Sequence, residues 1–242
     1  MNNPSIELAW GGGRWPKRQK KVVEPTMQTA IDFSRLAIEE IGFEYAQPKR
    51  INIWRCGRSE ECWGSSDGPT DIDVHIRVDH IKHRKVARFL FDLTLSLGHE
   101  LVHAIRSEFS DEPSLIEHIA SEGLAHVAED TLSHIVLGSE NAFQQANMVA
   151  QYSSTTEYSA MRKAMFDQRN YRWPRDGQDD EVRSEWLDIT SDSPPPGIIV
   201  GITEVQRRLA EGSTIVELMT RPAEEILDLN AGIYQPADRL LL

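Results

Sequence analysis

Residues 99–103 read His99-Glu100-Leu101-Val102-His103, and this HExxH stretch says more about fold and chemistry than any other part of the chain. Residues four apart lie on the same face of an α-helix, so the two imidazoles can bind one metal ion. Glu100 lies about 100° further around the helix, where its carboxylate can reach a water molecule on that metal. A metal ion that activates water and a carboxylate base that accepts its proton are the two groups that amide hydrolysis of this kind requires.

The residues around HExxH predict the helix that carries it. The apolar period changes to that of a helix at about Arg84, and the helix is expected to run to about Phe109. The side opposite the histidines is apolar, with Leu93, Leu97, Leu101 and Ala104. One face of this helix is therefore expected in the core, and the histidines project from it into a cleft.

A third metal ligand is expected on the next helix. Residues 110–113 combine candidate N-cap residues with Pro113, so a second helix should begin there and run to about Leu137, before Gly138. Residues 104–121 separate His103 from Glu122. At about 1.5 Å of rise per residue, an ideal helical hairpin would place these two residues within about 4–5 Å of the same height. Glu122 is therefore the expected third ligand.

The second helix has the same two-sided pattern as the first. Its apolar side holds Ile116, Ala120, Leu124, Val127 and Ile135, and its polar stripe holds His118, Glu122, His126 and Glu129. For an arbitrary helix such a stripe is simply solvated. Beside HExxH we expect Glu122 to bind the metal, and a solvated role stays open for the other three.

HELVH followed by the Glu122 of Ser121-Glu122-Gly123-Leu124-Ala125 resembles the glutamate-type zincins, or gluzincins, a group of zinc metallopeptidases. More narrowly, it resembles a bacterial domain-of-unknown-function family of predicted zinc-dependent proteases with an HExxH…SEGLA pattern. The resemblance covers roughly residues 70–230, and its motifs are most specific within residues 99–126. It implies a zincin-like fold, one Zn²⁺ per chain bound by His99, His103 and Glu122, and Glu100 as the catalytic base.

The chain departs from the family pattern at two places. A Gly-Tyr-x-x-Gly-like turn entering a helix would correspond to residues 197–201, where Ile198 replaces the tyrosine. Gluzincins also often carry an acid four residues after the ligand glutamate, and His126 stands there. Glu129, one turn further on, is the candidate to replace that acid in orienting a zinc-binding histidine.

A peptidase also needs a donor that stabilises the tetrahedral oxyanion. Candidates from the sequence are Tyr152, Tyr158, His134 and Tyr171. For each of them, an ordinary role in a helix or loop is the favoured interpretation.

The N-terminal part is expected to hold a small sheet. Residues 1–24 are polar, glycine-rich and then basic, which predicts a flexible arm, and a helix should begin at Pro25 and end near Gly42. Residues 51–54 alternate, residues 64–69 are expected to form a turn, and residues 71–79 alternate with a clean period of two. The last of these strands is either an edge to which an extended peptide can add or an internal strand.

The C-terminal part is expected to be mainly helical. Helices are expected at about 141–167, 198–211, 214–219 and 223–229, with a long loop over 168–196. The fold class is therefore α+β. A single zincin-like domain over 25–242 would comprise a β-rich part at about 45–80, active-site helices at about 84–137 and a helical part at about 139–242.

Composition limits the partners. The formal net charge of −12 argues against nucleic acid, since phosphates would be repelled. There is no apolar signal core and no run of 18 apolar residues, which predicts a cytoplasmic protein without a membrane anchor. Cys56 and Cys62 are expected to be reduced thiols, with a second metal site formed with His80 or His83 as a weaker alternative.

The sequence therefore predicts a zinc metallopeptidase that acts on a peptide or protein substrate. The alternative is a catalytically weak or inactive zinc-binding module with a regulatory or partner-binding role. The substrate, the cleavage specificity and the oligomeric state are left open by the sequence.

Overall fold

The structure, a computed structural model, describes residues 6–43, 50–56, 63–66, 71–77, 86–109, 114–137, 156–172, 181–187 and 195–229. Its elements are, in chain order, β1 (Glu7–Trp10), α1 (Lys17–Ile41), β2 (Arg50–Cys56), β3 (Trp63–Ser66), β4 (Asp71–Arg77), α2 (Val86–Arg106), α3 (Leu115–Leu137), α5 (Thr156–Asp167), α6 (Glu181–Leu187), α7 (Pro196–Ala210), α8 (Ile215–Thr220) and α9 (Ala223–Ile226). The chain is α+β, as expected. It divides into two compact units, one of Met1–Glu108 with Thr131–Glu140 and one of Phe109–Asp130 with Asn141–Leu242.

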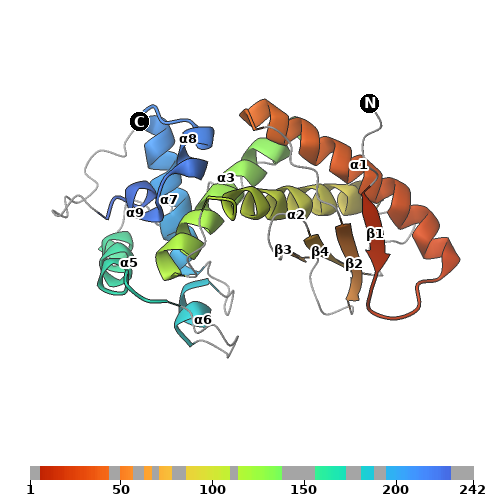
Figure 1. Cartoon of the computed structure of the whole chain (residues 1–242), viewed down its shortest axis with the longest axis horizontal. Helices are drawn as coiled ribbons and strands as arrows, with labels where there is room; N and C mark the ends of the chain where they lie inside the picture. The colour runs from red at the N-terminus through yellow and green to blue at the C-terminus, as the bar shows by residue number, and fades with distance from the viewer. Residues whose placement is uncertain are drawn as a thin grey trace. The chain divides into compact units, whose positions relative to one another are not determined.

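The first unit contains a four-stranded sheet in the order β1-β2-β4-β3 (Figure 1). β1, β2 and β4 are parallel to their neighbours, and β3 is antiparallel to β4. The connection from β1 to β2 runs through the long helix α1, as a parallel pair requires. α2 contacts α1, β3 and β4 and is thereby held against the sheet.

The alternation in β2 and β4 gives the sheet one apolar face. Ile51, Ile53, Ile72, Val74 and Ile76 are all buried. The other face pairs polar and aromatic residues that are partners in the strand register. Asn52 donates a hydrogen bond to Asp73 at 2.7 Å, and the Trp54 ring stacks on His75 with centroids 6.1 Å apart.

The predicted flexible arm over residues 1–24 differs from the structure. Glu7–Trp10 is a strand paired with β2, and α1 begins at Lys17, so that Pro25 lies inside the helix. Trp15 is buried, packs edge-on against Trp10, and donates from its indole N–H to the Gly11 carbonyl. The burial of Trp15 and the pairing of β1 with β2 order this segment despite its polar composition. The predicted end of the helix is confirmed, since Gly42 caps it with a left-handed φ of 102°.

The sheet corrects one expectation for the strands and decides between two alternatives for another. Residues 63–66 form β3 where the sequence predicted a turn over 64–69, of which 67–69 lie outside the described residues. β4 lies between β2 and β3, so it is the internal strand and not an edge for an added peptide. Strand order depends on which segments pair, and alternation within one segment does not encode it.

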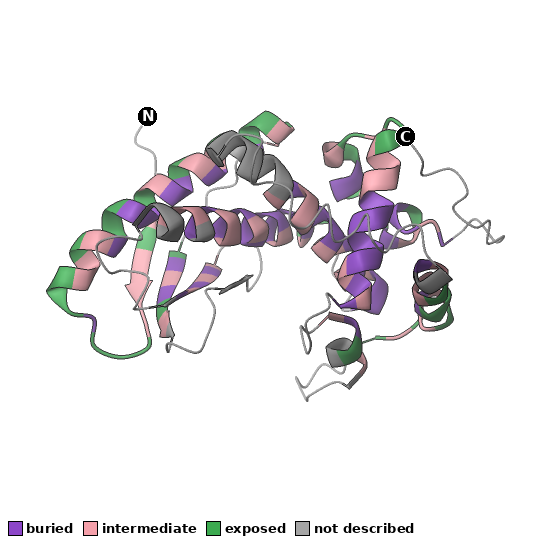
Figure 2. Cartoon of the chain, turned by 180° about the vertical axis from the view of Figure 1, so that it is seen from behind, coloured by how far each residue is buried: buried purple, intermediate pink, exposed green. Residues whose placement is uncertain are grey.

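The second unit is helical, and α7 lies at its centre. Residues from Gly197 to Val205 of this helix are buried on nearly all sides, as the purple ribbon of α7 shows (Figure 2). A helix buried all around needs neighbours on every face. α7 contacts α5, α6 and α9, and it crosses α3 at Gly201.

The crossing of α3 and α7 brings two backbones into contact. A Cβ atom on Gly201 would collide with the Ile119 carbonyl oxygen and lie 3.1 Å from the Gly123 Cα. A Cβ atom on Gly123 would collide with the Gly201 backbone. Only glycine fits at either position, and the pair fixes the segment of α3 that carries Glu122.

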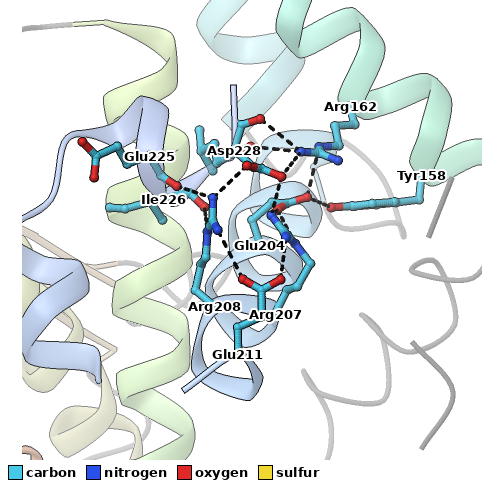
Figure 3. Close-up of polar contacts among 10 residues, drawn as sticks. Tyr158, Arg162, Glu204, Arg207, Arg208, Glu211, Glu225, Ile226 and Asp228 are labelled. Carbon is cyan, nitrogen blue, oxygen red and sulfur yellow. Dashed lines mark hydrogen bonds and ion pairs between the residues drawn. The ribbon is translucent and has the colours of Figure 1, made fainter. Parts of the chain in front are cut away.

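A partly buried network of charges joins α5, α7 and the residues after α9 (Figure 3). Glu204, which is 1% exposed, accepts hydrogen bonds from Arg207 and from the Tyr158 hydroxyl and pairs with Arg162 at 3.1 Å. Asp228 adopts a left-handed φ of 58° and pairs with Arg162, Arg207 and Arg208. The buried Glu204 carboxylate and the partly buried Asp228 carboxylate are therefore both matched by guanidinium groups, which offsets their desolvation.

The remaining helices follow the sequence closely, with one difference. α7, α8 and α9 agree with the helices predicted over 198–229. α6 interrupts the predicted loop over 168–196 because Trp186 is buried and bonds to Gln168. The predicted helix over 141–167 is described only from Thr156 onward. Within the described residues, no helix is both long and apolar enough to cross a membrane.

Candidate metal centre

The two histidines of HELVH converge in the structure. His99 and His103 lie one turn apart on α2, and their Nε2 atoms are 2.9 Å apart. Their rings meet edge-on, with centroids at 4.6 Å. Around a tetrahedral zinc ion, two imidazole nitrogens at about 2.0–2.1 Å from the metal are about 3.3 Å apart. The observed spacing is about 0.4 Å shorter and is that of a hydrogen bond in which one ring donates to the other. The two nitrogens are nevertheless close enough together to be candidates for binding one ion.

The rest of α2 holds this pair in place. Leu93, Leu97, Leu101 and Ala104 are buried, as predicted, whereas the two histidines are half-buried. The Ser34 hydroxyl of α1 donates to the Thr94 carbonyl at 3.3 Å, inside the contact between the helices. Glu100 directly follows His99 in the sequence. It is 5% exposed, so its side chain is largely shielded from bulk water.

The expected third ligand lies on α3 within a second cluster of side chains. Glu122, His126 and Glu129 occupy successive turns of that helix and are all partly buried. His126 lies between the two acids. Its Nδ1 is 2.8 Å from Glu129 Oε2, and its Nε2 is 3.8 Å from Glu122 Oε2. These three residues of the predicted stripe therefore form a connected chain of polar groups.

His118, the fourth member of the predicted stripe, lies near the start of α3. Its Nδ1 lies 3.3 Å from the Ser114 carbonyl at the start of α3. This local contact gives His118 a role at the helix terminus.

The Tyr158 hydroxyl is engaged in the buried network. It donates to Glu204 at 2.5 Å, and the side chain is 4% exposed. Burial raises the pKa of Tyr158 above its ordinary value of 10.0, and the Glu204 carboxylate raises it further. Tyr158 therefore acts in the structure as a donor to Glu204, which argues against its predicted role at an oxyanion. Tyr171 lies after α5, where its carbonyl accepts from the Leu115 N–H. Tyr152 and the His134 side chain lie outside the described part of the chain.

The segment compared with a Gly-Tyr-x-x-Gly-like turn is helical. Gly197 and Ile198 belong to the first turn of α7, and Gly201 lies inside the helix. Pro196 at the first helical position favours this start. The two glycines serve close packing, with Gly197 near Trp186 and Ile119 and Gly201 against α3. The sequence contained these glycines, but only the fold shows what they touch.

The structure thus brings His99 and His103 together in one unit, and Glu122, His126 and Glu129 together in the other. Sequence reasoning named all five but missed that His126 contacts both acids; the i, i+3 and i, i+4 spacings were the available signal. The Cys62 residue and the Cys56 side chain lie outside the described residues, as do His80 and His83. Comparisons of the chain with family models, curated proteins and solved structures found no match.

Proposed function

We propose that the protein is a zinc-dependent metallopeptidase in which His99, His103 and Glu122 bind one Zn²⁺ ion per chain. The observation that carries this proposal is the 2.9 Å spacing of the two Nε2 atoms on α2. Without a cation, two imidazoles this close must share a proton or repel each other's lone pairs. Both residues are half-buried, so a bound ion would satisfy both nitrogens at once.

The donor set agrees with this choice of metal. Imidazole nitrogen with a carboxylate oxygen is a common zinc ligand set, and three protein ligands leave room for water. His99, His103 and Glu122 have the chemistry to hold an ion, as do His99, His126 and Glu129. Both sets draw on the two units, so the proposal requires that α2 and α3 present these side chains to one ion.

Zinc, when bound, supplies a Lewis acid that lowers the pKa of water toward about 7 and polarises a carbonyl. The chain's own contribution to the reaction is the Glu100 carboxylate. It accepts the proton of the attacking water and delivers it to the leaving amine. Because Glu100 is buried, bulk water solvates its carboxylate little, and the proton it holds is shielded from exchange.

A second candidate is a zinc-binding module with little or no catalysis. The observation in its favour is that Tyr158 donates to Glu204, so this candidate oxyanion donor is used in the core of the helical unit. Such a module would retain the metal ligands, and Glu100 would then act only in packing.

Metal analysis tests the first step. The wild type should bind one zinc per chain, and His99→Ala or His103→Ala should abolish binding. His75→Ala is the matched control, since His75 stacks on Trp54 in the sheet and belongs to neither ligand set. Equal and negligible zinc in the wild type and His99→Ala would refute the metal site.

Turnover of a peptide library tests the second step. Removing a general base costs about 10²–10⁴-fold in rate, so Glu100→Gln should lose at least about 100-fold in activity while keeping its zinc. Activity that is unchanged in Glu100→Gln would show that this carboxylate is not the base. A wild type that binds zinc but cleaves no peptide would favour the zinc-binding module.

A further inference from the structure

β1 forms one edge of the sheet, and in the described part of the chain only β2 pairs with it (Figure 1). The Gly11 N–H donates to the Ile53 carbonyl of β2 at 2.9 Å, and backbone groups point to alternate sides along a strand. The N–H and C=O groups of Ile6, Leu8 and Trp10 therefore point away from β2. Such a row of donors and acceptors is a template for another strand.

The side chains of this edge also suit a partner strand. Leu8 and Trp10 point to the apolar face of the sheet, because their register partners on β2 are buried isoleucines, and both are half-buried. Natural sheet edges are commonly protected by proline, by a bulge or by charge. Residues 6–10 contain no proline, and their one charged residue, Glu7, is paired with Arg50 at 2.9 Å.

We propose that a second copy of this chain binds to β1, and that the two β1 strands pair antiparallel about a twofold axis at Leu8. Outward backbone groups then lie directly opposite each other, as antiparallel hydrogen bonding requires. Ile6 faces Trp10 of the other copy on the apolar side, and Glu7 faces the uncharged Ala9 on the other side. An axis at Glu7 would bring two carboxylates together, and an axis at Ala9 would leave Ile6 without a strand residue opposite it.

The charges of α1 favour a second copy over any other partner strand. The first two turns of the helix carry only cations, namely Lys17, Arg18, Lys20 and Lys21. Its second half carries mostly acids, namely Asp32, Glu39 and Glu40 with Arg35. All of these acids and three of the four cations of the first two turns are exposed. The helix therefore has a basic end and an acidic end on its surface.

A twofold axis through β1 would match these ends. α1 connects two parallel strands, so it runs opposite to β1, and the axis reverses its direction in the other copy. Both α1 helices then lie on the same face of the joined sheet, with the basic end of each toward the acidic end of the other. Leu36, which is 50% exposed among the acids, would be covered by the aliphatic stems of the basic side chains.

Sedimentation equilibrium of the full-length protein tests the strand pairing. The wild type should form dimers and nothing larger, because a twofold contact closes on itself. Leu8→Pro removes an outward N–H and keeps the bonds to β2, so it should stay monomeric where the wild type is dimeric. Leu8→Ala is the control for the lost side chain, and it should dimerise more tightly than Leu8→Pro. Circular dichroism checks that both variants fold.

Cross-linking tests the register. In a chain with Cys56→Ser and Cys62→Ser, Glu7→Cys mixed with Ala9→Cys should form a disulfide between copies, because directly opposite residues lie about 4.5–5.5 Å apart between their Cα atoms. Neither variant alone should form it. Ala9→Cys that cross-links by itself would overturn the axis at Leu8.

Charge reversal tests the arrangement of α1. Lys17→Glu with Lys21→Glu, and Glu39→Lys with Glu40→Lys, should each weaken the dimer by at least about 10-fold, since like charges then meet. An equimolar mixture of the two variants should associate at least as tightly as the wild type, because an acidic helix then faces a basic one. Misfolded variants would not regain association on mixing.

The outcomes are decisive in both directions. A wild type that is monomeric at every concentration would overturn the proposal and leave β1 to a different extended partner. A dimer that is unaffected by Leu8→Pro and by both charge variants would place the contact elsewhere and overturn it as well. None of these substitutions changes a proposed zinc ligand, so zinc binding is tested separately from dimerisation.

Discussion

Gly123 and Gly201 bring helices α3 and α7 into backbone contact one residue away from Glu122. Neither position has room for a side chain, so the two helix backbones touch. This close contact fixes how the two helices pack against each other at this point. The expected ligand glutamate is thus placed by a packing contact in the helical unit, and not only by the helix that carries it. In the proposed metal site, residues of α7 would therefore affect metal binding without touching the metal.

Gly201→Ala should destabilise the helical unit. The added methyl would collide with the Ile119 carbonyl, and overpacking of this kind costs about 1–3 kcal/mol. The measurement is the midpoint and slope of urea unfolding. Gln206→Ala, a partly exposed position on the same helix, is the control and should stay within about 0.5 kcal/mol. Wild-type stability in Gly201→Ala would mean that the helices are further apart than described.

Tyr158→Phe should change how stability depends on pH. The pKa of Tyr158 is raised in the folded state by burial and by Glu204, so the unfolded chain loses this proton first. Stability from this group is complete below the ordinary pKa of 10.0 and falls as pH rises above it, by up to about 1.4 kcal/mol per pH unit. Urea unfolding at pH 8, 10 and 11 should therefore show a smaller decline for Tyr158→Phe than for the wild type.

The same variant separates a structural from a catalytic role of the tyrosine. Loss of the hydrogen bond to Glu204 should cost about 1.5–3 kcal/mol at pH 8, since the acceptor is charged. In a Glu204→Gln background the cost should shrink toward that of a neutral bond. Equal costs in the two backgrounds would contradict the coupling, and a loss of turnover at full stability would restore the oxyanion role.

Trp15→Ala tests whether the N-terminal segment is a folded part of the first unit. Trp15 is 6% exposed and contacts Trp10, so its removal should cost about 3–5 kcal/mol. Thermal unfolding followed by circular dichroism measures this. Lys17→Ala, an exposed neighbour at the start of α1, should leave the melting temperature unchanged. A neutral Trp15→Ala would favour the flexible arm.

Zinc should stabilise the folded chain. A ligand that binds only the folded state contributes about 2.7 kcal/mol at 100 times its dissociation constant. Melting curves with excess zinc and with a chelator should differ in the wild type and coincide in His103→Ala. Identical curves in the wild type would argue against a zinc site of useful affinity.

Sequence periodicity predicted α2, the course of α3, the two central strands and the short C-terminal helices, because each is decided by local spacing of apolar residues. It failed at residues 6–24, where burial of Trp15 and pairing of β1 with β2 override a polar composition. It also failed at residues 181–187, where Trp186 anchors a short helix in a stretch rich in acids and prolines. In both cases a distant partner supplies the stabilisation.

The sequence alone identified the candidate metal ligands, since the i, i+4 spacing of His99 and His103 places both imidazoles on one face of any helix they form. Tertiary structure decided what the other polar residues do. In the folded chain Tyr158 donates to a buried carboxylate, and β4 is an internal strand. Gly201 makes the contact that positions the segment carrying Glu122. These roles depend on which segments meet, and that follows from packing of the whole chain and not from local spacing.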